Sequence, residues 1–117
     1  MNLPHLAPLL FAREVIERGE GFAVVLCEFE TLPSLPMFIE AAAQSAAAFD
    51  ESEEISNGFL VAVKNAERRI DPSVNRYRVK VSKEAEVGVA KRFFFEVLGV
   101  SDETVFASGS ITMVIEG

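Results

Sequence analysis

The chain has no tryptophan, one tyrosine, one histidine and one cysteine among its 117 residues. The lone cysteine, Cys27, cannot form an internal disulfide and belongs to no metal-ligand spacing. No apolar run approaches the roughly 18 residues that a membrane span needs, and the N-terminus lacks a charged segment followed by a hydrophobic one. We therefore expect a soluble, cytoplasmic protein with no membrane span and no metal or redox cofactor.

Positive charge is scarce and unevenly placed. Eleven basic residues face eighteen acidic ones, and the net charge of −7 argues against a nucleic-acid binder, because phosphate contacts need a basic surface. Nine of the eleven basic residues nevertheless fall between residues 64 and 92, beside four acids, so that this segment carries +5. They form either the solvent faces of strands or a binding surface for an acidic partner or a phosphate-bearing ligand.

Apolar residues are plentiful. They make up 50% of the chain and include ten phenylalanines, which is enough for the core of a single domain spanning residues 1–117. Apolar or alternating runs separated by turn residues predict six strands. The expected strands cover residues 9–18, 22–29, 58–64, 76–82, 87–97 and 104–115. The period of residues 9–18 also allows a helix.

The most distinctive segment is LPSLPMFIEAAAQSAAAF, residues 32–49. Ser34 is a suitable N-cap, and the two flanking prolines mark the start of a helix that we expect to end near Phe49. Six alanines let neighbouring elements approach this helix closely. Glu40 and Gln44 are four residues apart and therefore share one helix face, where the carboxylate is either a device of the fold or a reactive group.

The order strand, strand, helix and then four strands predicts an α+β arrangement. One apolar helix needs one curved antiparallel sheet to cover it. We see no repeat, linker or low-complexity tract that would divide the chain.

Three segments carry a resemblance to a known family. LPHLAPLLF (residues 3–11), IEAAAQ (residues 39–44) and VKNAERR (residues 63–69) resemble the opening signature, the central-helix motif and the following strand of 3-hydroxyacyl-acyl-carrier-protein dehydratases. That resemblance implies a hotdog fold, in which an antiparallel sheet wraps around one long central helix. More closely, the chain is similar to a divergent dehydratase-like branch found with aryl-polyene-type gene sets, in which the loop before the helix is shortened.

The resemblance also implies a reaction and a site. The reaction is dehydration of a 3-hydroxyacyl thioester in fatty acid or polyene-type biosynthesis, with the substrate carried on phosphopantetheine of an acyl carrier protein or on coenzyme A. Glu40 corresponds to the catalytic carboxylate. Gln44 is a substrate-binding candidate and, because an amide cannot exchange protons usefully, an orienting or fold-stabilising group rather than a catalyst. The backbone amides of Met37 and Phe38 are candidates to face the thioester oxygen. Assembly would be a homodimer or a pair of different hotdog subunits, with a continuous sheet.

Two further candidate positions and one departure complete the expectation. Arg68 and Arg69 either meet the phosphate of a phosphopantetheine arm or are exposed strand-end residues. The family's loop histidine is absent, because residues 27–33 contain none and His5 is the only histidine in the chain. His5 is then either a relocated catalytic group or a structural residue. The alternatives are an acyl thioesterase, which needs only the helix carboxylate, and a non-catalytic acyl-binding subunit.

Overall fold

The computed structural model describes residues 10–49 and 57–116. Six strands and one helix follow one another in the predicted order, strand, strand, helix and four strands. They are β1 (Ala12–Gly19), β2 (Phe22–Glu28), α1 (Leu35–Phe49), β3 (Asn57–Arg68), β4 (Arg76–Val87), β5 (Ala90–Leu98) and β6 (Val105–Glu116).

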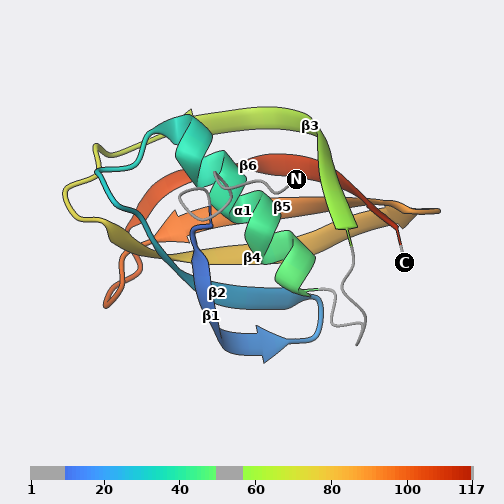
Figure 1. The fold of residues 1–117 in the computed structure, drawn as a ribbon, viewed down its shortest axis with the longest axis horizontal. Coiled ribbons are helices and arrows are strands. Elements are labelled where there is room, and N and C mark those ends of the chain that lie inside the picture. The colour runs from blue at the N-terminus through green and yellow to red at the C-terminus, as the bar shows by residue number, and fades with distance from the viewer. Residues whose placement is uncertain (1–9, 50–56, 117) are drawn as a thin grey trace, which may run out of the picture.

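The strands form one antiparallel sheet in the order β1-β2-β4-β5-β6-β3. Figure 1 shows this sheet curving around α1, which crosses its inner face. Although β3 follows the helix in sequence, it pairs with the last strand and therefore forms one edge of the sheet, and β1 forms the other. The sequence predicts an antiparallel sheet curved around one helix, and the structure agrees, whereas the order of the strands within the sheet was not predicted.

Alternation explains which side chains face α1. Successive residues of a strand point to opposite faces of the sheet, and the inward positions of the two central strands are fully buried apolar residues. They are Tyr77, Val79 and Val81 of β4, and Phe93, Phe95 and Val97 of β5. The intervening positions are polar or partly exposed, so the sheet has one dry face and one face toward solvent.

Alanine allows α1 to lie close to the sheet. Ala41, Ala42 and Ala46 are completely buried, and each separates the helix backbone from a strand by a single methyl group. Ser45 is buried on the same face, and its hydroxyl donates a hydrogen bond of 2.8 Å to the carbonyl of Ala41, so no polar atom is left unsatisfied there. The small residues of the helix therefore determine how tightly the sheet wraps it.

Several strand boundaries differ from the sequence prediction, and β1 begins at Ala12 rather than at residue 9. The strand expected at 87–97 begins only at Ala90, because the chain reverses at Gly88, whose φ of +62° is a left-handed value that glycine adopts without strain. The preceding strand correspondingly extends to Val87 rather than ending at residue 82. In addition, β3 extends to Arg68, beyond the expected end at residue 64, past an irregularity that places Asn65 at φ +55°.

Cys27 offers a pH-dependent test of the core. Its side chain is fully buried in β2, and burial raises its pKa from 9.0 to about 11, against smaller opposing effects of Ser45 and Arg13. Because the folded pKa lies above the unfolded one, the stability that the protonated thiol contributes is complete below about pH 9 and is lost as the pH rises through 11. We expect wild type to lose about 2 to 3 kcal/mol more unfolding free energy than Cys27→Ala over this range. Urea unfolding of both proteins at pH 8 and pH 11 measures the difference, and equal losses would contradict the burial argument.

Among the described residues, no helix combines the length and the apolarity that crossing a bilayer requires.

Candidate functional site

The face of α1 turned away from the sheet carries the candidate carboxylate. Glu40 is exposed, whereas the neighbouring Phe38, Ala41 and Ala42 are completely buried on the opposite side. In the single subunit this carboxylate is therefore not a core group held by the sheet. Its position makes it available to a molecule or a second subunit that covers the outer face of the helix.

Gln44 links Glu40 to the strand that starts the sheet. The Gln44 Oε1 accepts hydrogen bonds from the backbone amides of Phe11 (2.8 Å) and Ala12 (3.1 Å). Its Nε2 donates to Oε2 of Glu40 at 3.3 Å. The two amides determine which end of the side-chain amide is oxygen, so the nitrogen is directed toward the carboxylate. Gln44 thus orients Glu40 while it fixes the chain at the start of β1, and Glu40 Oε1 accepts no hydrogen bond from the described residues.

Replacing Gln44 with alanine should destabilise the fold by about 1 to 3 kcal/mol. The substitution leaves the amides of Phe11 and Ala12, both partly shielded from water, without their acceptor. Thermal unfolding measures the effect, which corresponds to a fall in Tm of several degrees for a domain of this size. The swapped double variant Glu40→Gln/Gln44→Glu is the matched control, since it keeps an acceptor for both amides and avoids two carboxylates side by side. A Tm for Gln44→Ala equal to that of wild type would contradict the assigned bonds.

The amides of Met37 and Phe38, the candidates to face the thioester oxygen, both form hydrogen bonds within the first turn of α1. The hydroxyl of Ser34 accepts a hydrogen bond of 3.4 Å from the Met37 amide, as expected of an N-cap. The amide of Phe38 donates to the Ser34 carbonyl at 3.0 Å, and the Phe38 ring packs edge-on against Phe29 and Tyr77. Both amides therefore already have acceptors within the turn, which leaves them less available to a thioester oxygen.

Arg68 and Arg69 lie at the end of β3 and bind groups of the protein itself. Arg69 donates to the hydroxyl of Ser108 on β6 at 3.1 and 3.3 Å and pairs with Glu67 at 3.3 Å. Arg68 pairs with Asp71 at 3.5 Å. These contacts favour the strand-end interpretation of the two arginines over a role in phosphate binding. His5, the remaining candidate, lies outside the described residues.

Six of the nine basic residues of the segment pair with acids, some across the sheet and some along the same strand or its adjoining loop. Arg76 pairs with Glu28 and Arg78 with Glu103. Four more pairs join nearby positions, and they are Lys83 with Glu86, Arg92 with Glu84, and the Arg68 and Arg69 pairs described above. Four of the six partner acids belong to the segment itself and are already counted in its +5, so Glu28 and Glu103 reduce the excess only to +3. The pairing still favours the interpretation of most of these residues as solvent faces of strands.

Sequence reasoning did not single out a hollow of about 520 Å³ at one end of the sheet. It lies between residues 73–77 and 99–106 and is lined by Asn75, Arg76, Tyr77, Asp102 and Phe106, among others. The buried Tyr77 hydroxyl accepts hydrogen bonds from the amides of Ser73 and Val74 at 3.2 and 3.3 Å. The sequence feature that could have pointed to this hollow is its single tyrosine, since the other aromatic residues of the chain are all phenylalanine.

In the described ranges, no cluster of three or more histidine, cysteine, aspartate or glutamate side chains is positioned to hold a metal ion.

The sequence matches no protein-family model and no curated protein. Solved structures are similar to it in fold. One is the dehydratase heterocomplex ApeI:P from Xenorhabdus doucetiae, with a TM-score of 0.74 at 14% identity over 98% of this chain and 88% of that one. Another is smu.793 from Streptococcus mutans bound to acetyl CoA, with a TM-score of 0.67 at 10% identity over 89% and 88%.

A third similar structure is a variant of the thioesterase SAV0944 from Staphylococcus aureus, with a TM-score of 0.64 at 9% identity over 89% of this chain and 93% of that one. Dehydratases and thioesterases thus both occur among the hotdog-fold neighbours. Likeness at these identities concerns the fold alone, and the six-stranded antiparallel sheet around one helix agrees with the hotdog fold of these neighbours.

Proposed function

We propose that this protein acts on acyl thioesters and removes water from a 3-hydroxyacyl thioester, with Glu40 as its acid–base group. The observation that carries the proposal is the exposed Glu40 carboxylate on the central helix, held through one oxygen by Gln44 and left open at the other. The fold shared with a dehydratase heterocomplex supports it. Substrates would arrive on an acyl carrier protein or on coenzyme A, with no resident cofactor.

The proposed reaction needs two proton transfers. The Glu40 carboxylate takes the proton from the carbon next to the thioester carbonyl, and the electron pair of that C–H bond becomes the new C=C bond. The C–O bond of the 3-hydroxyl breaks, and the hydroxyl leaves as water after receiving a proton. Gln44 keeps one carboxylate oxygen in place, so that the other faces the substrate.

His5 is the proposed donor of the second proton, because it is the only histidine that the chain can supply. A His5→Ala variant tests this role separately from that of Glu40. Loss of dehydration with an unchanged Tm supports a catalytic His5. Full activity would show that Glu40 or a partner subunit returns the proton.

A second subunit would complete the site. In the single chain Glu40 is exposed, and β3 is an edge strand with partly exposed apolar side chains at Leu60, Val61 and Val63. An open, apolar strand edge favours pairing with another chain. We therefore include in the proposal a dimer joined through β3, formed with an identical or a different hotdog subunit.

Thioester hydrolysis is the second candidate. A helix carboxylate can activate water or attack the carbonyl without a histidine. This matters because the chain has only one histidine. The structural likeness to a thioesterase also favours this alternative. The two reactions differ in product, since dehydration leaves the thioester intact and hydrolysis releases a free acid.

The proposal is tested by incubating the purified full chain with 3-hydroxyacyl thioesters of acyl carrier protein and of coenzyme A, with products identified by mass spectrometry. We expect loss of water from the intact thioester. Release of free acid would overturn dehydration in favour of a thioesterase. No reaction on either carrier would overturn both and indicate a non-catalytic acyl-binding subunit.

A further inference from the structure

The solvent face of the sheet, opposite α1, contains a hollow that has no part in the proposed activity. It has a volume of about 250 Å³ and lies over β6, between β3 and β5. Ser110 of β6 stands opposite Lys64 of β3, and Thr112 of β6 stands opposite both Ala62 of β3 and Arg92 of β5. Two cations therefore flank two hydroxyl groups on one face of three adjacent strands.

Lys64 differs from most of the basic segment in its surroundings. It is exposed and forms neither an ion pair nor a hydrogen bond with the described part of the chain. Six other basic residues of the segment, including Arg76 and Arg78, pair with acids on the same strand, a neighbouring strand or a loop. An ammonium group without an acidic neighbour is a donor available to an anion.

Arg92 is held in position and still has donors to offer. Its Nε pairs with Oε1 of Glu84 at 3.3 Å, and its two terminal nitrogens form no hydrogen bond with the described residues. One bond at Nε orients the planar guanidinium. The remaining pair of N–H groups is the fork that arginine presents to phosphate oxygens.

The hydroxyls of Ser110 and Thr112 are the polar groups between these cations. Neither takes part in a hydrogen bond with the described residues, and the methyl group of Ala62 leaves the space beside them open. Hydroxyls can donate to an anionic oxygen as well as accept. The hollow thus has donors on three strands and no carboxylate among its lining residues.

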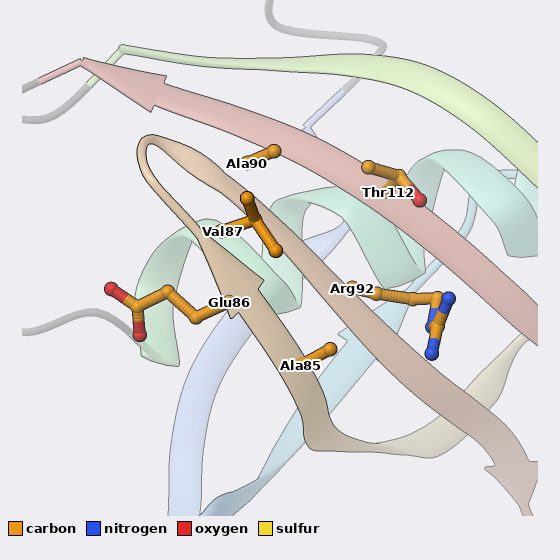
Figure 2. Close-up of a pocket in the computed structure, with 6 residues that line it drawn as sticks. All are labelled: Ala85, Glu86, Val87, Ala90, Arg92 and Thr112. Carbon is orange, nitrogen blue, oxygen red and sulfur yellow. The ribbon is translucent and has the colours of Figure 1, made fainter.

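An apolar hollow continues from the same two side chains. Figure 2 shows Arg92 of β5 beside Thr112 of β6, with Ala85, Val87 and Ala90 of the β4–β5 hairpin near them and α1 behind the strands. The sixth lining residue, Glu86, directs its carboxylate away from this group. Val87 is 78% exposed. An occupant with its charge over Lys64 and Arg92 would therefore meet apolar surface toward the tip of the hairpin.

We infer that this surface is a binding site for a phosphate ester with an apolar substituent, the phosphate lying between Lys64 and Arg92 and the substituent against Val87. Phosphate fits the donor set because it offers several anionic oxygens to cations and hydroxyls at once. The site lies on the opposite face of the sheet from Glu40 and does not depend on the proposed activity.

The experiment titrates the isotope-labelled full chain with inorganic phosphate and with hexyl phosphate at constant ionic strength, and follows backbone amide signals by NMR. We expect shifts at Lys64, Ser110 and Thr112, and tighter binding of hexyl phosphate than of inorganic phosphate. Val87→Ser should remove most of that difference. Equal affinities of the two probes for wild type would overturn the ester assignment.

Charge variants separate a specific site from general attraction. Lys64→Met and Arg92→Met should each weaken phosphate binding by about threefold or more, as expected for exposed charge pairs. Glu84→Gln should strengthen it, because the amide oxygen still accepts from Arg92 Nε while the opposing negative charge is removed. Lys80→Met is the matched control. Lys80 lies on β4, on the same face of the sheet as Arg92, but outside the hollow. A loss with Lys80→Met as large as with Lys64→Met, or no change in Arg92→Met and Glu84→Gln, would overturn the site.

Discussion

Glu40→Gln should lower the rate of thioester turnover by about 100-fold or more, while the fold remains as stable as wild type. The size of the loss follows from the usual contribution of a positioned acid–base group, since an amide of almost the same shape cannot take up the proton. Stability should not change because Glu40 is exposed and its single described hydrogen bond, to Gln44, is long at 3.3 Å. The glutamine oxygen can still accept that bond.

Single-turnover kinetics with Glu40→Gln and wild type, with Tm measured for both, test this expectation. Glu17→Gln is the matched control, because Glu17 is also exposed but lies on the edge strand β1. Turnover by Glu40→Gln within a few fold of wild type would exclude Glu40 as the acid–base group. Equal losses in both variants would show that the change acts through net charge rather than through the site.

The helix and its carboxylate could be predicted because their signals are local. The Ser34 N-cap, the flanking prolines and the alanine run determine where α1 begins and ends, and the four-residue spacing alone places Glu40 and Gln44 on one face. What Gln44 binds could not be predicted. The two donors to Gln44 Oε1, the amides of Phe11 and Ala12, are 33 and 32 residues away in sequence. Only the packing of β1 beside the helix brings them to Gln44.

The same limit applies to the charged residues. The sequence shows that the positive charge is concentrated between residues 64 and 92, but it does not show which strands become neighbours. The partners Glu28 and Glu103 lie outside that segment, so two of its five excess positive charges meet acids from elsewhere in the folded chain. Lys64 and Arg92 are likewise brought to one hollow because β6 lies between β3 and β5, a strand order that the sequence does not state.

Strand ends were predicted less well where backbone conformation decides them. Alternation continues through residues 87–89, so the pattern alone favours a strand, whereas Gly88 at φ +62° places a turn there. In β3 the irregularity between Lys64 and Glu67 interrupts the alternation and conceals the continuation of the strand to Arg68. A left-handed residue such as Asn65 is compatible with either a turn or a bulge.

Charges placed on the β3 edge should convert the proposed dimer into monomers and abolish its activity. The variant Val61→Glu/Val63→Glu replaces side chains that are 56% and 41% exposed, so the cost to the isolated subunit should be small. Across a paired edge the same glutamates would face their symmetry mates, and like charges opposite one another destabilise strand pairing. Because the site on α1 would be completed by the second subunit, turnover should fall together with dimer formation.

Light scattering after gel filtration should give wild type about twice the 12.8 kDa of one chain and the double variant the mass of one chain. The matched control is Ile16→Glu on the opposite edge strand, β1, where the side chain is 45% exposed, and it should remain a dimer. A monomeric wild type would refute self-association through β3. A dimeric double variant with full activity would place the interface elsewhere. A wild type that is active only when a second hotdog chain is added would identify that chain as the partner of the β3 edge.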